Sequence, residues 1–387
     1  MNSTKKEEIY FKNLDGLRFL AAFAVIIGHC QAILYRGSDL IGIRAYSPFA
    51  DKIGSFGVDF FFVLSGFLIS FLLMREIEET QTVKVRHFYL RRFLRIWPLY
   101  FTVGIVYILC GTTFSLFFGG WLDYPPVAQN RSQLLDNLWY LGTFSINFQT
   151  LWHLGNQFQV GHFWSLSVEE QFYLLWAPVF WIFRKNLLPI IILFVTIGFL
   201  LNLPPQSWFP TYHRFQYNFT ANRFLQFGTG ALFAWLLHQG YLTPQYPLSK
   251  RLSWTLQIVV LLPMMLHLMG KHYYPDLYKD GYEQISTTLI SVVIVASAIT
   301  RYSIMNFEFN LLKYLGKISF GIYVYHIFAV RTVEYFLLHN GHAPLIERNP
   351  IYQFLFPAFS TFFAVFLSGL SYEFLEKPFL KLKTKFK

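Results

Sequence analysis

Five ionisable residues in apolar runs have the types and spacing for proton transfer. A helix over the first run puts Asp15, Arg18 and His29 on one face, because eleven residues end about 20° past three full turns. Asp59 and Glu169 lie in two other apolar runs. At ~1.5 Å per residue, His29 and Asp59 lie roughly 8 Å below the outer ends of their runs, and Glu169 roughly 11 Å. This convergence predicts a buried imidazole that acts as a general base on a hydroxyl, positioned by carboxylates.

A second set of residues suits phosphate binding. On a helix over residues 86–95, Arg92 and Arg95 share a face, with Arg91 beside them. Paired guanidiniums bind phosphate through bidentate hydrogen bonds. A phosphate-binding site about half a bilayer away from His29 matches a cofactor with a phosphorylated head and a long arm. His326, some 12 Å from the inner face, would line its path.

Each group also has a simpler interpretation. A histidine in a membrane helix can serve only to bond a neighbouring helix, which applies to His29 and His326. The basic stretch can be an ordinary anchor at the inner face of the membrane. Asp59 and Glu169 can form structural pairs with arginines or backbone donors. The residues alone leave these alternatives open.

Membrane helices must position these side chains. The chain has 387 residues and is 54% hydrophobic, 20% aromatic and only 14% charged, a composition that excludes a soluble or disordered protein. Its apolar runs are long enough to cross ~30 Å of hydrocarbon. Ten spans are predicted, at Leu14–Leu34, Gly54–Met74, Trp97–Phe118, His162–Phe183, Leu187–Leu203, Phe224–Gln239, Ser253–Met269, Gln284–Thr300, Ile318–Leu338 and Ile351–Ser371. The shorter run Leu138–Phe148 is predicted to be interfacial or re-entrant.

The 32 Lys and Arg predict the topology. With the N-terminus inside, the inner segments carry more than twice as many as the outer segments, as the positive-inside rule requires. We therefore predict an all-α, polytopic transmembrane helical bundle of about ten spans, with both termini cytoplasmic and residues 1–387 in one integral membrane domain. The bilayer is the expected partner; nucleic acid is not, despite a net charge of +11. Two cysteines are too few for a metal cluster, and no metal is expected.

Six blocks follow one another along the chain. They are Leu14 to Arg18 with Gly28 and His29, Phe60 to Ile69, Tyr89 to Tyr100, Trp164 to Tyr173, Leu315 to Tyr323 with His326, and Glu376 to Pro378. In this order they resemble the acyltransferase 3 family of integral membrane O-acyltransferases, which modify bacterial surface polysaccharides. One block alone is weak evidence for the family, but the six in this order are strong evidence and cover almost the whole chain.

The resemblance implies a membrane acyltransferase that moves an acyl group, usually acetyl, from acyl-coenzyme A on the cytoplasmic side to a hydroxyl of a lipid-linked or surface glycan. The bacterial cytoplasmic (inner) membrane is its expected location. By analogy His29 is the base or transient acyl carrier, and Arg18 orients the first-helix site. Arg92 and Arg95 bind the phosphates of acetyl-coenzyme A, with Arg91 adjacent.

Two features depart from the family pattern. Phe19 stands where the family often has glycine. Some members carry an extra hydrolase-like domain, and this chain ends at Lys387 without one, so direct transfer to a sugar is expected. A proton-coupled glycan transporter or flippase that uses His29, Asp59 and Glu169 is the alternative, although the related halves of many transporters are not seen. A catalytically silent assembly partner is a third possibility, disfavoured by the full set of blocks.

Overall fold

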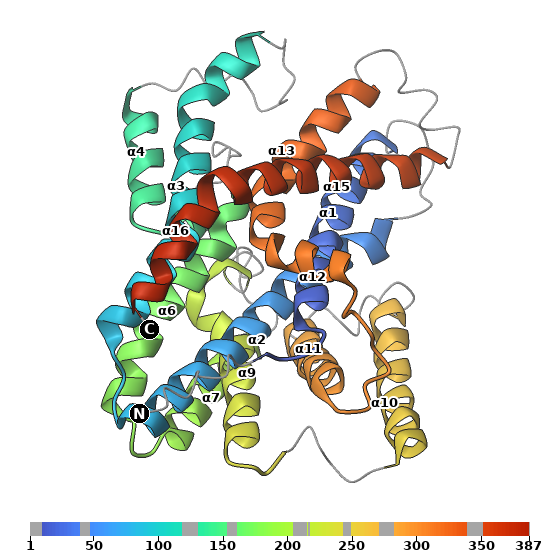
Figure 1. Cartoon of the computed structure of the whole chain (residues 1–387). Coiled ribbons are helices and arrows are strands. Elements are labelled where there is room, and N and C mark those ends of the chain that lie inside the picture. The colour runs from blue at the N-terminus through green and yellow to red at the C-terminus, as the bar shows by residue number, and fades with distance from the viewer. Residues whose placement is uncertain are drawn as a thin grey trace.

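The computed structural model describes residues 10–38, 47–117, 131–152, 161–203, 215, 217–242, 249–270, 282–338 and 351–386. In these ranges every regular element is a helix, which confirms the all-α prediction (Figure 1). All ten predicted segments are helical. They are α1 (Leu14–Ser38), α2 (Ser47–Thr80), α3 (Val85–Phe117), α6 (Trp164–Ile182), α7 (Leu188–Asn202), α9 (Phe224–His238), α10 (Lys250–Gly270), α11 (Tyr282–Ile299), α13 (Ser319–Leu338) and α15 (Ile351–Ser371).

Several of these helices have the length and composition of membrane spans. Among the described residues, Leu14–Ile33, Lys52–Thr80, Val85–Leu109 and Phe354–Leu382 are both long and apolar enough to cross a bilayer. Large apolar side chains on α7 and α15 are exposed, among them Leu200, Phe359 and Phe362, as expected for helices that face lipid. The chain therefore has the features of a multi-pass membrane protein. Ten crossings and cytoplasmic termini stay predictions.

Short helical elements complete the chain. They are α4 (Arg131–Gly142), α5 (Ile146–Trp152), η1 (Gly161–Phe163), η3 (Thr220–Arg223), α12 (Asn310–Lys317), the π-helical turn η5 (Tyr372–Glu376), α16 (Lys377–Leu382) and η6 (Lys383–Phe386). The predicted short run Leu138–Phe148 falls across α4 and α5, and Phe144 between them has a left-handed backbone (φ 51°). This break keeps the run from forming one continuous helix.

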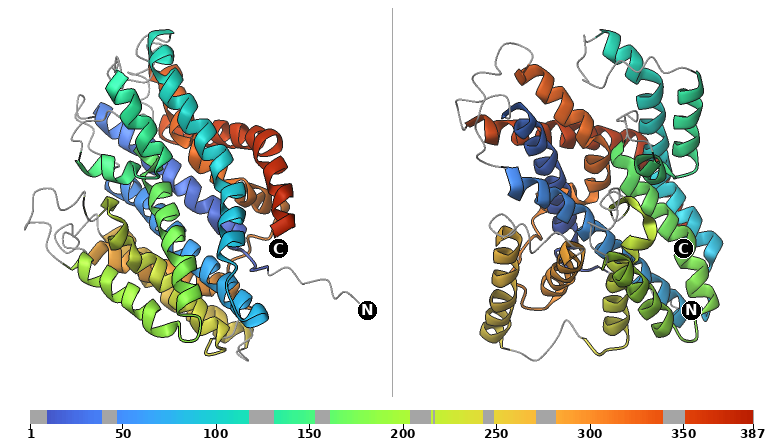
Figure 2. Two further views of the ribbon diagram at one scale, coloured as in Figure 1. Left: turned by 90° about the vertical axis from the view of Figure 1, so that its left-hand side faces the viewer. Right: turned by 180° about the vertical axis from the view of Figure 1, so that it is seen from behind.

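Helix α2 is the central element of the bundle. It packs against α1 and α9, while α7 flanks α9 and α13 pairs with α15 (Figures 1 and 2). Gly66 of α2 lies directly on the backbone of Phe227, and Gly230 of α9 lies on the backbone of Val63. A Cβ atom at either position would overlap main-chain atoms. The two glycines therefore allow the close approach that small residues give membrane helices.

Helix α3 differs from its predicted form. The span was expected to begin at Trp97, but the helix begins at Val85 and runs through Pro98 without a break. Proline removes one main-chain hydrogen bond, to the carbonyl four residues earlier, and the helix continues here on either side. The basic stretch is therefore the first part of a membrane helix. Arg92 and Arg95 are carried on a rigid element that leads into the bundle.

A polar cluster fixes the beginning of α1. The backbone N–H of Asn13 donates to Glu308 Oε1 (2.6 Å), its side-chain amide donates to the Ala298 carbonyl (2.8 Å), and Lys313 Nζ lies 3.1 Å from Glu308. Burial disfavours the charged form of Glu308, but these bonds and one from Tyr10 outweigh it and hold its pKa below the ordinary value. The first turn of α1 is thus tied to the segment between α11 and α12.

Candidate active site

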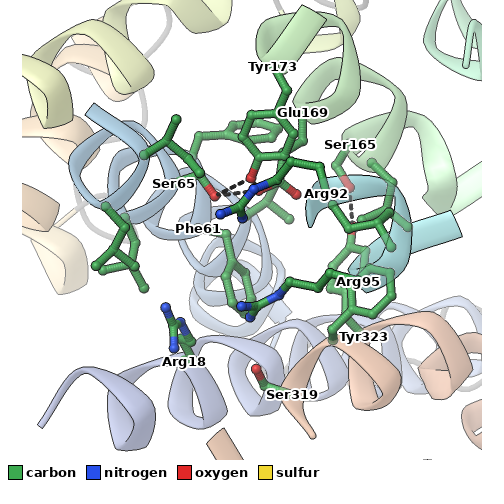
Figure 3. Close-up of a pocket in the computed structure, with 18 of the residues that line it drawn as sticks. Arg18, Phe61, Ser65, Arg92, Arg95, Ser165, Glu169, Tyr173, Ser319 and Tyr323 are labelled. Atoms are coloured by element: carbon green, nitrogen blue, oxygen red, sulfur yellow. Dashed lines mark hydrogen bonds between the residues drawn. The ribbon is translucent and has the colours of Figure 1, made fainter. Parts of the chain in front are cut away.

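Five helices line a cavity of about 260 Å³ within the bundle (Figure 3). Its polar wall is formed by Arg18 of α1, Ser65 of α2, Arg92 and Arg95 of α3, Ser165, Glu169 and Tyr173 of α6, and Ser319 and Tyr323 of α13. Figure 3 shows the guanidinium group of Arg18 from α1 and those of Arg92 and Arg95 from α3 around the same space. The structure therefore brings together Arg18 and the arginine pair, which the sequence placed in separate groups.

The three arginines differ in their partners. Arg18 forms the predicted pair with Asp15 at 2.6 Å. Within the described part of the chain, neither Arg92 nor Arg95 forms a salt bridge. Arg92 lies over the rings of Phe88 and Tyr173, at 5.6 Å from each centroid, and its buried Nε has no hydrogen-bond partner. These two guanidiniums retain unused donors toward the cavity, as an anion site requires.

A larger cavity of about 970 Å³ shares Arg18, Arg92 and Arg95 with the first one. Its volume lies within the ~300–1,000 Å³ of ligand pockets. Its basic side chains are Arg18, Arg75, Lys84, Arg91, Arg92, Arg95, Lys313, Lys317 and Lys383, against the acidic Asp15, Glu76, Glu79 and Glu376. The excess of positive charge attracts a polyanion. Unlike Arg92 and Arg95, Arg91 forms a salt bridge: its guanidinium donates to Glu76 (3.1 Å) and to the Phe386 carbonyl (3.0 Å).

Three consecutive residues of α6 point to three different neighbours, because each step turns the helix by about 100°. Glu169 faces the cavity, where it accepts hydrogen bonds from Ser65 and Tyr173. Glu170 is buried and accepts from the Trp97 indole N–H (3.1 Å), whereas Gln171 donates to the Phe144 carbonyl (2.6 Å). The predicted face of Ser165, Glu169 and Tyr173 is confirmed as one wall. Glu169 is the carboxylate of this block that reaches the cavity.

Helix α1 places His29 differently from the prediction. The prediction of a buried imidazole is wrong, because the side chain of His29 is exposed. Its neighbours explain this: Gly28 packs on Gly54 of α2, and Cys30 is fully buried on the other side. Position 29 therefore falls on the open face between them. An exposed imidazole can still meet a hydroxyl that arrives from outside the bundle.

The prediction that Asp59 lies at the depth of His29 is also wrong. Gly54 lies opposite Gly28, and Gly57 touches Val25, so the antiparallel register puts Asp59 roughly 10 Å deeper than His29 at ~1.5 Å per residue. The error arose because α2 begins at Ser47 rather than at Gly54. Depth counted from Gly54 was therefore too small.

Asp59 forms a buried ion pair. Its carboxylate accepts from Arg223 (2.8 Å) and from the Thr287 hydroxyl (2.9 Å), and both charged side chains are almost fully buried. The Arg223 guanidinium also lies over the rings of Tyr217 (4.7 Å) and Trp164 (5.5 Å). Asp59 therefore forms the structural pair with an arginine that its simpler interpretation predicted. The bonds of its carboxylate join α2 to η3 and α11. Its predicted role beside His29 is not supported by this geometry.

Three histidines meet at the far side of Tyr323. The ring centroid of His326 lies 5.0 Å from those of His29 and His162, and 5.2 Å from that of Tyr323. Tyr323 bonds Ser165 at 2.5 Å, so it lies between the cavity and the histidines. His326 is buried behind this pair and is not among the residues that line either cavity, so its expected place on the cofactor path stays a prediction. Sequence reasoning missed His162, whose signal was a histidine at the edge of the Trp164 block.

Comparison with known proteins identifies the class. Residues 11–371 match the family model described as an acyltransferase domain, acyltransferase 3, and the chain belongs to that family. The predicted resemblance is confirmed.

Three curated relatives illustrate the similarity. The chain is 26% identical to the peptidoglycan O-acetyltransferase OatA of Listeria monocytogenes over 98% of its own length, and 25% identical to a putative O-acetyltransferase of Staphylococcus aureus (strain COL), also over 98%. It is 26% identical to the O-acetyltransferase OatA of Staphylococcus aureus (strain NCTC 8325) over 96%. The matched region is 57%, 60% and 57% of these three relatives, so the chain spans well under two thirds of their length. No solved structure matches the chain.

Proposed function

We propose that this protein transfers an acetyl group from acetyl-coenzyme A to a hydroxyl of a bacterial surface or lipid-linked glycan, in the cytoplasmic membrane. One observation carries the proposal: Arg92 and Arg95, without salt bridges in the described chain, line both a smaller cavity and a larger basic one. The relatives named as O-acetyltransferases support acetyl as the group transferred, and one named for peptidoglycan supports a glycan acceptor.

The donor would bind with its charged end among the arginines. The larger basic cavity suits the phosphates of coenzyme A, with Arg92 and Arg95 as bidentate donors. The uncharged arm would extend through the smaller cavity, whose other lining is largely apolar, toward Ser165 and Tyr323. Glu169 closes the wall beside Arg92 and offsets part of its charge. We propose the cytoplasmic side for this donor site.

His29 would act on the acceptor. In direct transfer its ring nitrogen takes the proton of the acceptor hydroxyl, the oxygen attacks the thioester carbonyl, and the carbon–sulfur bond breaks to release the coenzyme thiolate, which then takes up a proton. In the alternative route the ring nitrogen of His29 first accepts the acetyl group and then passes it to the hydroxyl. Initial rates distinguish the two routes, because only the second gives a ping-pong pattern.

The test is release of free thiol from acetyl-coenzyme A by the purified full chain in detergent, with and without a crude surface-glycan extract. Thiol release should depend on the extract and should fall by about 10²- to 10⁴-fold in His29→Ala, the usual contribution of a general base. His238→Gln is the matched control. His238 is the last residue of α9, pairs with the exposed Glu78 of α2 and lines neither cavity. Failure of the wild type to bind or cleave acetyl-coenzyme A would overturn the proposal. Proton-coupled glycan movement in vesicles would then support the transporter.

A further inference from the structure

Two buried hydroxyls meet on the wall of the smaller cavity that faces the histidines. Ser165 Oγ of α6 and Tyr323 Oη of α13 lie 2.5 Å apart, and Figure 3 draws the bond between them. Both side chains line the smaller cavity and neither lines the larger one. The ring centroids of His326 and His162 lie 5.2 Å and 6.4 Å from that of Tyr323. The hydroxyl pair therefore lies between the cavity and the histidine cluster.

The pair has one hydrogen more than its short bond uses. A hydroxyl carries one hydrogen and two lone pairs, so one of the two O–H groups forms the 2.5 Å bond and the other remains. Within reach of that other hydrogen is the main-chain carbonyl of His162, 3.4 Å from Ser165 Oγ and 3.3 Å from Tyr323 Oη. Both distances exceed the ~2.5–3.0 Å of a normal O–H···O bond. The remaining O–H is thus weakly held, and a better acceptor that enters the cavity can take it.

The other hydroxyls of the smaller cavity are less suited to a ligand at this wall. Those of Ser65 and Tyr173 both donate to Glu169. Ser319 lies one turn before Tyr323 on α13, roughly 6 Å closer to α12. Because α12 lines the larger basic cavity, Ser319 lies toward the end that would hold the phosphates. The hydroxyl pair lies at the end away from it, where the uncharged arm of the donor would finish.

We propose that Tyr323 is a catalytic residue: its O–H, supported by Ser165, donates to the carbonyl oxygen of the thioester at the end of the donor arm. The role rests on the proposed function. When the nucleophile bonds to the carbonyl carbon, negative charge develops on the carbonyl oxygen and the hydrogen bond from Tyr323 strengthens. The C=O bond re-forms as the carbon–sulfur bond breaks and the thiolate leaves. Tyr323 keeps its hydrogen throughout, because the proton of the acceptor hydroxyl goes to His29.

The surroundings of Tyr323 make such a donor effective. Ser165 is 4% and Tyr323 7% exposed, and the ring of Phe61 packs edge-on against the tyrosine at 6.1 Å between centroids. A donor fixed in a dry, apolar site stabilises developing charge more than the same donor in water. When Tyr323 donates to the substrate, Ser165 can donate to Tyr323 Oη, and hydrogen bonds in such a chain polarise one another.

Infrared difference spectroscopy tests the contact directly. The full chain in detergent is given acetyl-coenzyme A with and without ¹³C at the thioester carbonyl, in the His29→Ala background so that the donor is not consumed. A hydrogen bond lowers the stretching frequency of a carbonyl. Tyr323→Phe keeps the ring against the histidines and should shift this frequency upward. Tyr89→Phe is the matched control and should leave it unchanged, because the Tyr89 hydroxyl donates to the Leu174 carbonyl (2.7 Å) and lines neither cavity.

Kinetics with His29 intact supply the second measurement. Tyr323→Phe should lower kcat by about 10²- to 10³-fold, the usual effect of losing one such donor, and leave KM for acetyl-coenzyme A unchanged. Ser165→Ala should lower kcat less and raise the carbonyl frequency in the same direction, so it decides the question if Tyr323→Phe does not fold.

An unchanged carbonyl frequency in either variant overturns the inference, whatever the activity. A rise in KM with unchanged kcat in Tyr323→Phe also overturns it, since the hydroxyl would then only bind the donor. Both results leave the proposed function standing. Failure of the parent chain to bind acetyl-coenzyme A would instead refute the proposed function itself.

Discussion

Replacement of Arg95 by glutamine tests whether the arginine cavity binds phosphate. Within the described residues Arg95 forms no salt bridge and, unlike Arg92, does not lie over an aromatic ring, so its removal should disturb the packing little. A hydrogen bond to a charged group contributes about 1.5–3 kcal/mol. With about 1.4 kcal/mol for each tenfold change, the affinity for acetyl-coenzyme A should fall roughly 10- to 150-fold.

The effect should be on KM rather than kcat. Phosphates far from the reacting carbonyl bind equally in ground and transition states, so their loss changes binding alone. Arg95→Lys keeps the charge but loses the bidentate geometry and should lie between wild type and Arg95→Gln. Arg184→Gln is the control, because Arg184 lines neither cavity and its guanidinium donates to the Trp181 carbonyl at 2.9 Å. This substitution should therefore leave both KM and kcat nearly unchanged.

The assay measures initial rates of thiol release against donor concentration, once with acetyl-coenzyme A and once with acetylpantetheine, which has no phosphate. If Arg95 binds phosphate, the substitution should raise KM for acetyl-coenzyme A and leave that for acetylpantetheine almost unchanged. An equal rise in KM for both donors would refute the reasoning, since Arg95 would then contact the arm of the donor or support the fold. No change with either donor would remove Arg95 from the donor site.

Three further predictions concern the fold. Asp59→Asn leaves the Arg223 charge buried and should lower the free energy of unfolding by about 3–5 kcal/mol, measured by denaturant titration in detergent; lost activity at full stability would contradict the structural role. Gly66→Ala should prevent α2 from packing on α9 and lower the yield of folded protein, whereas Gly142→Ala, with open space around its Cα, should not; equal yields would contradict the close approach. The depressed pKa of Glu308 means that its bonds stabilise the fold above the unfolded-state pKa of about 4.3 and are lost as pH falls; Glu308→Gln should weaken this acid dependence of the unfolding midpoint, and an identical pH profile would contradict it.

Hydrophobic runs and short-range spacing were sufficient for much of the fold. Apolar length located all ten long helices, because an apolar run of some 20 residues has few other stable forms. Helical periodicity also gave the pair of Asp15 with Arg18 and the shared face of Ser165 and Glu169, since these relations lie within one helix.

Relations between helices were harder to predict. The depth of Asp59 depended on where α2 begins, and its partner Arg223 lies 164 positions away along the chain. The exposure of His29 follows from which sides of α1 are covered by other helices, which periodicity within α1 does not report. The meeting of His29, His162 and His326 likewise depends on how α1, η1 and α13 pack together. A list of ionisable residues in spans found two of the three, but their mutual distances needed the structure.

The central claim is that His29 enables transfer of acetyl from a coenzyme A thioester to a glycan hydroxyl. The most direct measurement supplies isotopically labelled acetyl-coenzyme A and a glycan extract to wild type and His29→Ala, and counts labelled O-acetyl ester on the glycan against free thiol. The account predicts one ester for each thiol released by the wild type, and neither product above background with His29→Ala. Thiol without ester, or an equal yield of ester from His29→Ala, would contradict it.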